Sequence, residues 1–431
     1  MSQPRQADWL LVHEALQRIL DAVQPLETEE VALTEALGRT LAEPVTSPID
    51  QPPWDNSAMD GFAVRAADVR GATTAAPRAL RVIESVAAGA FPTRTVGPGE
   101  AVRLMTGAPI PAGADGVIRI EHARVMAGVV EIFDDADAGR NVRRRGEDLV
   151  RGTEVLRAGV VLRAGEVGVL ATVGRARVPV GRRPRVGLLS TGDELTEIGD
   201  TAAVLAGRRI VDSNSYGLAA AALALGAEPV RLGIARDDAS SLEEHLVPAL
   251  DLDALVTTAG ASVGDHDLVK DVLERIGMRT AFWRVRIRPG SPFSFGWIAR
   301  SGRPPLPVFG LPGNPVSALV TFEVLVKPAL RKMLGRSKLH SRTIHVRVAD
   351  RIKSPPGLMR FLRVTLEARG AEWLARLTGE QGSGILSSVA RADALLVVPL
   401  EVETLEAGTT AMALPLAPQD DAQDTIGFHT G

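Results

Sequence analysis

The chain contains 431 residues, with a formal net charge of −3 at pH 7 and a pI of about 6.2. Hydrophobic residues make up 45% of it and aromatic residues 4%, so mainly aliphatic cores in roughly two to four domains are expected. The near-neutral charge argues against a nucleic-acid or anionic-membrane binder, which would carry a concentrated basic field. No cysteine is present, which excludes disulfides, thiolate nucleophiles and Cys-ligated metal sites.

The N-terminal region is predicted to be helical to about Ser47. One helix face is indicated by the spacing of its apolar residues Leu10, Leu11, Leu16, Ile19 and Leu20. The segment lacks the features of a signal peptide, and the longest apolar stretch, Gly217 to Ala227, is too short to cross a bilayer. We therefore expect a cytoplasmic protein. Residues 1–47 and 149–180 are predicted to form one helical and linker domain.

Residues 48–148 are rich in Gly, Pro and Val and contain short extended runs, so they predict a β-dominated module. Three of its loops carry candidate functional side chains. Asp60 stands beside a flexible glycine, Thr106 lies in a rigid Gly/Pro loop, and a run of three arginines starts at Arg143 and is followed by Asp148. Such a run usually forms a solvated face, but the planar guanidinium also suits phosphate or oxyanion recognition.

From Gly181 the chain alternates between strand and helix patterns up to residue 335. This βαβ series predicts a mostly parallel sheet covered by helices. Residues 336–418 return to short alternating strands, which predict a small β-barrel or sandwich. The polar tail 419–431 is predicted to be disordered. The fold class is therefore a multidomain combination of α/β and β structure.

Polar side chains follow every strand of the predicted parallel sheet, where ligands of such sheets bind. They form four groups, namely Ser190, Thr191, Gly192 and Glu194; Asp212 and Asn214; Asp237 and Asp238; and Ser262, Gly264 and Asp267. A single acid there is usually a helix cap or a solvated residue. Several converging acids repel each other unless a cation intervenes, and carboxylates suit Mg²⁺ whereas hydroxyls and glycine turns suit phosphate.

The segment Leu306–Ala318 predicts a strand, a rigid loop and a helix that runs from Val316 toward Leu334. Proline suits the first helical position because its missing N–H would have no intrahelical partner. A helix start after such a loop is a potential anion site. Its candidate binding residues are Pro312, Gly313, Asn314, Pro315 and Ser317.

These motifs, in this order, resemble the molybdopterin molybdenumtransferase family, which includes bacterial MoeA and the C-terminal domain of gephyrin. The matching segments span nearly the whole chain and are NSAMDGFAV, RLMTGAPIPAGAD, VRRRGED, GLLSTGDEL, VDSNS, GIARDD, SVGDHD, RIRPGSPFSFG, GLPGNPVSA and QGSGILSSVARADAL. The resemblance implies a four-domain homodimer with a MogA-like α/β domain. Its active site would lie between that domain and the β-dominated module of the partner chain.

The resemblance also implies a reaction and its residues. Molybdate would meet adenylylated molybdopterin, the metal would enter the dithiolene, and AMP would be released with the help of Mg²⁺. A MogA-like adenylyltransferase and molybdoenzyme-maturation proteins are the partners it suggests. The site residues carried over by motif are Asp60, Thr106, Arg143, Asp148, Glu194, Asp237 or Asp238, Asp267, Pro312, Pro315 and Ser383.

One segment departs from the family pattern, which carries lysines at positions 284 and 288 and often at 291. This chain has Arg284, Arg288 and Ser291 there. A strand Ala281–Ile287 would place Arg284, Arg286 and Arg288 on one face, so we predict that these arginines line the anion side of the site. Ser291 removes a charge.

Two other functions compete with the molybdenum-inserting enzyme. A nucleotide hydrolase or adenylyltransferase could use the same α/β domain, but MogA-type adenylyltransferases lack the N-terminal β-dominated module. A catalytically silent, gephyrin-like scaffold is the second alternative, and the acids at the strand ends weigh against it because no structural role requires them.

Overall fold

The computed structural model describes residues 9–258, 268–370 and 372–416, which divide into two compact units. The first unit comprises Met1–Ala42, Gly159–Arg163 and Arg177–Gly431. The second unit comprises Glu43–Ala158 and Ala164–Ala176. The boundaries of the four domains expected from the sequence stay a prediction.

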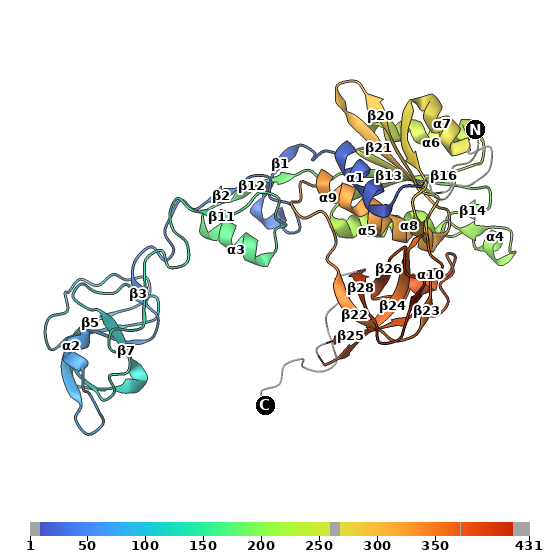
Figure 1. The fold of residues 1–431 in the computed structure, drawn as a ribbon. Helices are drawn as coiled ribbons and strands as arrows, with labels where there is room; N and C mark the ends of the chain where they lie inside the picture. The colour runs from blue at the N-terminus through green and yellow to red at the C-terminus, as the bar shows by residue number, and fades with distance from the viewer. Residues whose placement is uncertain (1–8, 259–267, 371, 417–431) are drawn as a thin grey trace. The chain divides into compact units, whose positions relative to one another are not determined.

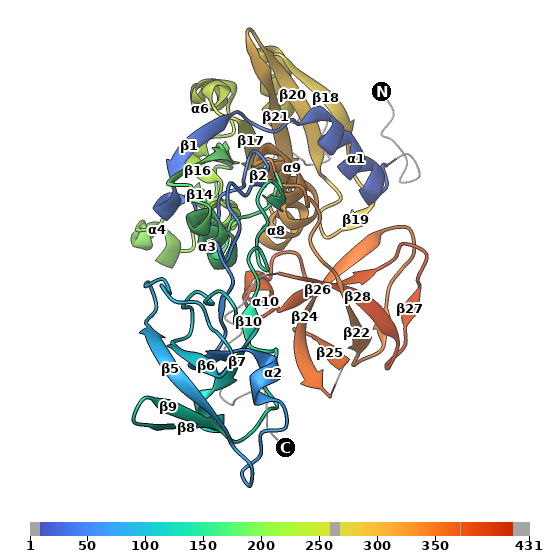
Figure 2. The same cartoon turned by 90° about the vertical axis from the view of Figure 1, so that its left-hand side faces the viewer.

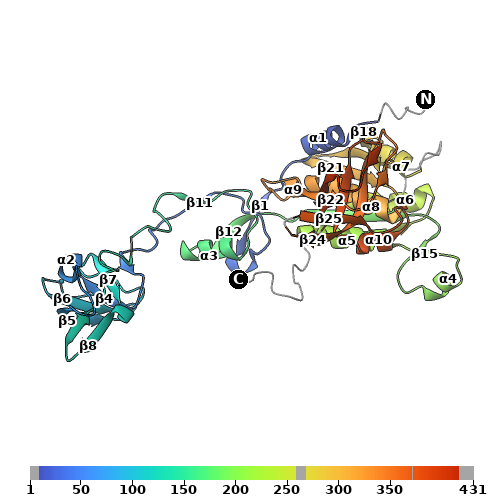
Figure 3. The same ribbon diagram turned by 60° about the horizontal axis from the view of Figure 1, so that its bottom comes forward.

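The second unit is built on a six-stranded sheet with the order β7-β4-β6-β5-β9-β8. Its strands are β4 Gly61–Val64, β5 Arg78–Val86, β6 Glu100–Leu104, β7 Gly116–Arg119, β8 Ala123–Met126 and β9 Val129–Ile132. The short helix α2, Ala66–Val69, lies beside this sheet (Figures 2 and 3). Two small pairs complete the unit, β2 Val45–Thr46 with β11 Glu154–Leu156 and β3 Asn56–Ser57 with β10 Val142–Arg143. The predicted β-dominated module is therefore present.

The first unit contains the predicted α/β sheet, in the order β16-β13-β17-β21-β20-β18. The parallel strands are β13 Arg185–Thr191, β16 Glu228–Ala235, β17 Ala254–Thr258 and β21 Arg303–Leu311. Strands β20 Ser294–Arg300 and β18 Met278–Trp283 extend the sheet in antiparallel pairing. The sheet is thus mostly parallel, with an antiparallel edge that the sequence pattern did not predict.

Helices cover both faces of this sheet (Figure 1). Along β13, Val186 and Leu188 point into one core and Leu189 into the other, as the alternation of side chains requires. The first core is shared with α1 Val12–Ala22, α5 Ser213–Leu225, α8 Pro315–Thr321 and α9 Lys327–Met333. The second core is shared with α6 Ala239–Leu246 and α7 Leu268–Ile276. Helices α8 and α9 are joined by a π-helical turn, Phe322–Val326.

A closed five-stranded barrel completes the first unit, with the order β24-β25-β22-β28-β26 and a further β24–β26 pairing (Figure 2). Its strands are β22 Ile344–Val348, β24 Met359–Arg369, β25 Glu372–Leu377, β26 Ala394–Val398 and β28 Thr410–Pro415. The barrel strands pair with one another around the closed sheet, and the start of β24 also pairs with the short strand β19, Ile287–Arg288. The helix α10, Leu386–Ala390, precedes β26, and the pair β23 Ile352–Lys353 and β27 Thr404–Leu405 lies beside the barrel.

Helices are fewer in the N-terminal region than its sequence predicts. After α1 the described chain forms β1, Thr28–Ala32, and a 3₁₀ turn, Leu33–Glu35. Strand β1 pairs with β12, Arg177–Gly181, in antiparallel register. The helix α3, Ala164–Thr172, lies within the second segment of the predicted helical and linker domain, residues 149–180. Small elements also surround α5, namely β14 Leu195–Thr196, α4 Thr201–Leu205 and β15 Ile210–Val211.

The predicted strand Ala281–Ile287 is wrong. Strand β18 ends at Trp283, because Arg284 takes a left-handed backbone conformation with φ of 75° that a strand cannot contain. The chain then forms β19, Ile287–Arg288, which pairs with barrel strand β24 and not with the α/β sheet. Arg284, Arg286 and Arg288 therefore do not share one face of a single strand.

Candidate active site

A cavity of about 560 Å³ lies in the first unit, where the loop before α8 faces β19 and barrel strand β24. It brings together five of the residues predicted from the sequence, namely Arg288, Pro312, Asn314, Ser317 and Ser383. These residues come from three separate parts of the chain. The fold thus gathers predicted binding residues from the α/β domain and the barrel in one place.

Backbone contacts fix the walls of this cavity. Pro315 occupies the start of α8, and the next amide, Val316 N–H, donates to the Ser383 carbonyl at 3.1 Å. Asn214, at the start of α5, donates from Nδ2 to the Gly313 carbonyl at 2.6 Å. Gly290 has φ of 112°, and a β-carbon there would lie 2.3 Å from Thr321 Cγ2, so only glycine permits the loop to pack against α8.

Two arginines of β24, Arg360 and Arg363, also line the cavity and were not predicted as site residues. Arg363 is fully buried, donating from Nε to Ser388 Oγ at 3.0 Å and from Nη2 to the Gly382 carbonyl at 3.0 Å. Its Nη1 is buried without a hydrogen-bond partner. An arginine inside the otherwise apolar run of residues 361–364 was the sequence signal that could have revealed this position.

The cavity is strongly electropositive. Arg288, Arg360 and Arg363 line it, and no carboxylate is among its described lining residues. Burial lowers the pKa of both Arg360 and Arg363, and the neighbouring charge of Arg288 lowers that of Arg360 further. Arginine nevertheless stays protonated at neutral pH, because its ordinary pKa is so high. Uncompensated buried cations favour an anionic ligand.

A second group of predicted residues gathers at the carboxyl edge of the parallel sheet. Thr191 Oγ1, at the end of β13, donates to Asp237 Oδ1 at 2.9 Å, and Ser190 Oγ lies 3.0 Å from Thr258 Oγ1. Gly192 has φ of 148°, and a β-carbon there would lie 2.6 Å from a carboxylate oxygen of Glu194. Asp238 caps α6 by accepting the Ser241 N–H at 2.8 Å. Within the described ranges, no group of three acids or histidines is placed to hold a metal ion.

Asp212 caps α5 and is almost completely buried. Its Oδ1 accepts the Ser215 N–H at 3.1 Å, while its Oδ2 is buried without a partner. The Oδ1 atom of Asn214 is buried without a partner as well. The capping role explains one carboxylate oxygen, and the other retains unused hydrogen-bonding capacity.

The second unit brings two predicted residues together. Asp60 Oδ1 accepts the Thr106 N–H at 2.6 Å and the Thr106 hydroxyl at 2.8 Å. These bonds hold the pKa of Asp60 below its ordinary value. Arg143 lies in β10 opposite Asn56, and the side chains of Arg143 and Asp148 are exposed. The two arginines that follow Arg143 form ion pairs with Asp55 and Asp50.

Four other predicted residues lie apart from the cavity or cannot be placed. Arg284 is not among the residues that line the cavity, and its guanidinium stands 5.1 Å from the centre of the Trp9 ring. Ser262, Gly264 and Asp267 lie outside the described residues.

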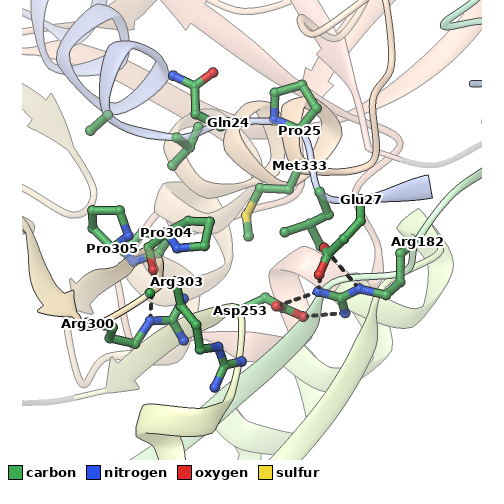
Figure 4. A pocket seen from close by; sticks show the side chains of 15 residues that line it. Gln24, Pro25, Glu27, Arg182, Asp253, Arg300, Arg303, Pro304, Pro305 and Met333 are labelled. Carbon is green, nitrogen blue, oxygen red and sulfur yellow. Dashed lines mark hydrogen bonds and ion pairs between the residues drawn. The ribbon is translucent and has the colours of Figure 1, made fainter.

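A smaller cavity of about 170 Å³ occurs near the amino ends of β17 and β21 (Figure 4). Two acids of this cavity neutralise Arg182, and backbone carbonyls hold Arg300. Arg182 donates to both oxygens of Asp253 at 2.8 Å and also pairs with Glu27, while Arg300 donates to the Pro304 carbonyl (Figure 4). Arg300 also donates to the Leu252 carbonyl. These contacts join α1, β12 and the sheet, so this cavity has a structural explanation.

Comparison with known proteins identifies the family. Residues 10–174 match the family described as MoeA N-terminal region (domain I and II), residues 187–332 a probable molybdopterin binding domain, and residues 345–416 the MoeA C-terminal region (domain IV). No helix within the described ranges is long and apolar enough to cross a membrane.

Relatives match over nearly the full length. A molybdopterin molybdenumtransferase of Nostoc sp. is 38% identical over 401 residues, covering 92% of this chain and 90% of the relative. That of Bacillus subtilis is 34% identical, covering 96% and 95%. The crystal structure of the molybdopterin biosynthesis moeA protein from Pyrococcus horikoshii OT3 aligns with a TM-score of 0.81 and 32% identity, covering 94% of this chain and all of that one. The predicted fold class, with its MogA-like sheet domain, is therefore confirmed, and the chain belongs to the MoeA family of molybdopterin molybdenumtransferases.

Proposed function

We propose that this enzyme of molybdenum cofactor biosynthesis transfers molybdenum from molybdate to the dithiolene of adenylylated molybdopterin and releases AMP. The observation that carries the proposal is the cavity with three guanidinium groups and no described carboxylate in its wall. Both substrates present oxyanions, and guanidinium groups bind the oxygens of phosphate and molybdate through charge-assisted hydrogen bonds. Because the chain has no cysteine, the sulfur ligands of the metal come from the substrate.

The cavity residues have distinct roles in this proposal. Arg288 and Arg363 would bind oxyanion oxygens, and the unpartnered Nη1 of Arg363 supplies a donor already oriented by its other hydrogen bonds. Ser317 and Ser383 offer hydroxyls beside them. Donors fixed before the ligand arrives lose little conformational entropy on binding, which favours tight recognition.

The release of AMP requires cleavage of a phosphoanhydride, in which water adds to phosphorus and the phosphate oxygen leaves with AMP. A bound Mg²⁺ would neutralise the charge that develops on the leaving group. Glu194 and Asp237 fit such an ion, because Mg²⁺ is usually held by one or two carboxylates together with substrate phosphates. The Thr191 hydroxyl holds Asp237 at the carboxyl end of β13, whereas Asp238 caps α6, so we assign the ligand role to Asp237.

The second unit would complete the site in a homodimer. Asp60 is a carboxylate at neutral pH, and its two hydrogen bonds from Thr106 lower its pKa further. We propose that Asp60 and Thr106 of one chain act with the α/β domain of the partner chain, with Arg143 and Asp148 nearby. A MogA-like adenylyltransferase would supply the substrate, because adenylylation must precede the release of AMP.

The test is to incubate the protein with adenylylated molybdopterin, molybdate and Mg²⁺ and to measure AMP. Glu194→Ala and Asp237→Asn should lose AMP formation by orders of magnitude, since each removes a metal-positioning carboxylate. Glu243→Ala is the matched control, because Glu243 lies on α6 and pairs only with Arg275 on the surface. Unaltered turnover in both site variants would contradict the metal assignment.

The same experiment separates the alternative functions. An adenylyltransferase or nucleotide hydrolase would consume ATP with or without molybdopterin and would not need molybdate. A silent scaffold would release no AMP under any of these conditions.

A further inference from the structure

Two arginines of the cavity stand directly opposite one another. Strand β19 pairs with β24 in parallel register, and Arg288 is the register partner of Arg360. Paired residues of neighbouring strands project to the same face, and like charges placed opposite one another destabilise a sheet. Both side chains line the cavity. Arg288 is exposed and Arg360 half-buried, so solvent weakens the repulsion of this pair without removing it, and a bound anion would relieve the rest.

Nothing in the described wall of the cavity neutralises this pair. Arg360 is half-buried, and its one hydrogen bond is a long one from Nη2 to the Pro355 carbonyl, at 3.3 Å. Its Nε is buried without a partner. Burial and the charge of Arg288 both lower the pKa of Arg360, so its protonated form is disfavoured beside this neighbour. An anion between the two guanidinium groups would remove both penalties.

Ser291 lines the same cavity and carries no charge. Its hydroxyl donates to the Ile287 carbonyl and so closes the turn after β19. The segment that holds Ser291 therefore contributes one cation to the cavity, Arg288, and the next comes from the barrel.

We propose that Arg360 is an anion-binding residue of this cavity, where it forms with Arg288 a paired guanidinium clamp and supplies from the barrel the positive charge that position 291 lacks. This inference rests on the proposed function, and it adds a specificity residue contributed by β24. The ligand is a tetrahedral oxyanion, whose oxygens can accept hydrogen bonds from two guanidinium groups at once. It could be molybdate or the phosphate of the nucleotide, and separate titrations distinguish these two sources.

The experiment measures binding of molybdate alone and of AMP alone by titration calorimetry, and then AMP release with the full substrate. The variants are Arg360→Ala, Arg360→Lys and the double variant Arg360→Ala with Ser291→Lys. Arg351→Ala is the matched control, because Arg351 is an exposed arginine beside the barrel that pairs with Glu406 and does not line the cavity. Thermal unfolding of every variant checks that the barrel remains folded.

Arg360→Ala should weaken binding of one of the two anions by about 10-fold or more, as expected for the loss of a charge-assisted hydrogen bond. Arg360→Lys should retain part of the affinity, and Ser291→Lys in the Arg360→Ala background should recover at least part of it. Wild-type affinity for both anions in folded Arg360→Ala would overturn the inference, as would a double variant no better than the single one. If the wild-type protein itself releases no AMP, the proposed function fails instead, whatever the binding data show.

Discussion

A substitution of Arg363 should distinguish the contribution of this side chain to fold stability from its contribution to ligand binding. It is a fully buried cation with two short hydrogen bonds, to Ser388 and Gly382, and one unpartnered buried nitrogen. We predict that Arg363→Met leaves the free energy of unfolding nearly unchanged but removes the stabilisation that anions give to the wild-type protein. The long, apolar methionine preserves part of the side-chain volume.

Two opposing effects determine the change in the free energy of unfolding. Losing the two hydrogen bonds costs about 1.5–3 kcal/mol each, because their donor is charged. Removing a cation that is buried without a counter-ion should raise the free energy of unfolding by several kcal/mol. We therefore expect a net change within about 2 kcal/mol. An anion at 100 times its Kd should stabilise the wild type by about 2.7 kcal/mol, whereas a roughly 50-fold weaker Kd leaves about 0.65 kcal/mol at the same concentration.

Urea unfolding with and without molybdate or AMP measures both quantities. Four of the five tryptophans belong to the first unit, so their fluorescence reports mainly on the unit that contains Arg363. Arg347→Met is the control, because Arg347 lies on the exposed side of the same barrel and pairs with Glu372. Equal stabilisation of wild type and Arg363→Met by the anion would refute the reasoning, and so would a loss of more than about 4 kcal/mol without ligand.

Three further predictions concern other parts of the chain. Asp60→Ala should abolish AMP release, because it removes a carboxylate whose pKa Thr106 keeps low. Asp60 lies at the surface, so circular dichroism should show that the second unit stays folded, and near-normal turnover would rule out a role of Asp60 in the reaction. Mixing Asp60→Ala chains with Asp267→Ala chains should restore part of the activity if each site combines residues of two subunits. No recovery of activity, with subunit exchange proven, would exclude such composite sites. Asp253→Asn should lower the free energy of unfolding at pH 7 by about 2–3 kcal/mol through loss of the Arg182 pair. Burial raises the pKa of Asp253, but the Arg182 guanidinium and the Arg185 N–H outweigh burial and leave this pKa low. The stability that the Arg182 pair contributes is therefore present above the pKa of Asp253 in the unfolded chain. Urea titrations should show its loss as the pH falls below about 4.

The sequence predicted those parts of the fold that local signals determine. The alternation of strands and helices expected from Gly181 onward is present in the α/β sheet and its helices, and the short extended runs of residues 48–148 form the sheet of the second unit. Periodicity and capping act within one element, so they can be recognised without knowledge of the tertiary structure. Of the five cavity residues that were predicted, Pro312, Asn314 and Ser383 lie in loops with recognisable motifs, while Arg288 lies in β19 and Ser317 in α8.

The missed features depend on contacts between distant segments. The pairing of β19 with β24 joins residues about seventy positions apart in the sequence. It places Arg288 in the barrel sheet, whereas the predicted strand would have continued β18. Nothing near Arg284 in sequence indicates its left-handed backbone. Arg360 and Arg363 face the cavity only because the barrel closes in one register, and register is set by the whole sheet.

The two cavities of the first unit contain the same kinds of charged side chain but treat them differently. In the smaller cavity, Arg182 donates two hydrogen bonds of 2.8 Å to the carboxylate of Asp253. A side chain of the protein therefore neutralises this cation. In the larger cavity, Arg288, Arg360 and Arg363 converge with no described carboxylate in the wall. Arg288 is exposed and Arg360 half-buried, so the cost of an unmatched buried charge falls mainly on Arg363, which is fully buried, and a bound anion would compensate it. We expect this difference in compensation, and not the number of arginines, to make the larger cavity the place where oxyanions bind.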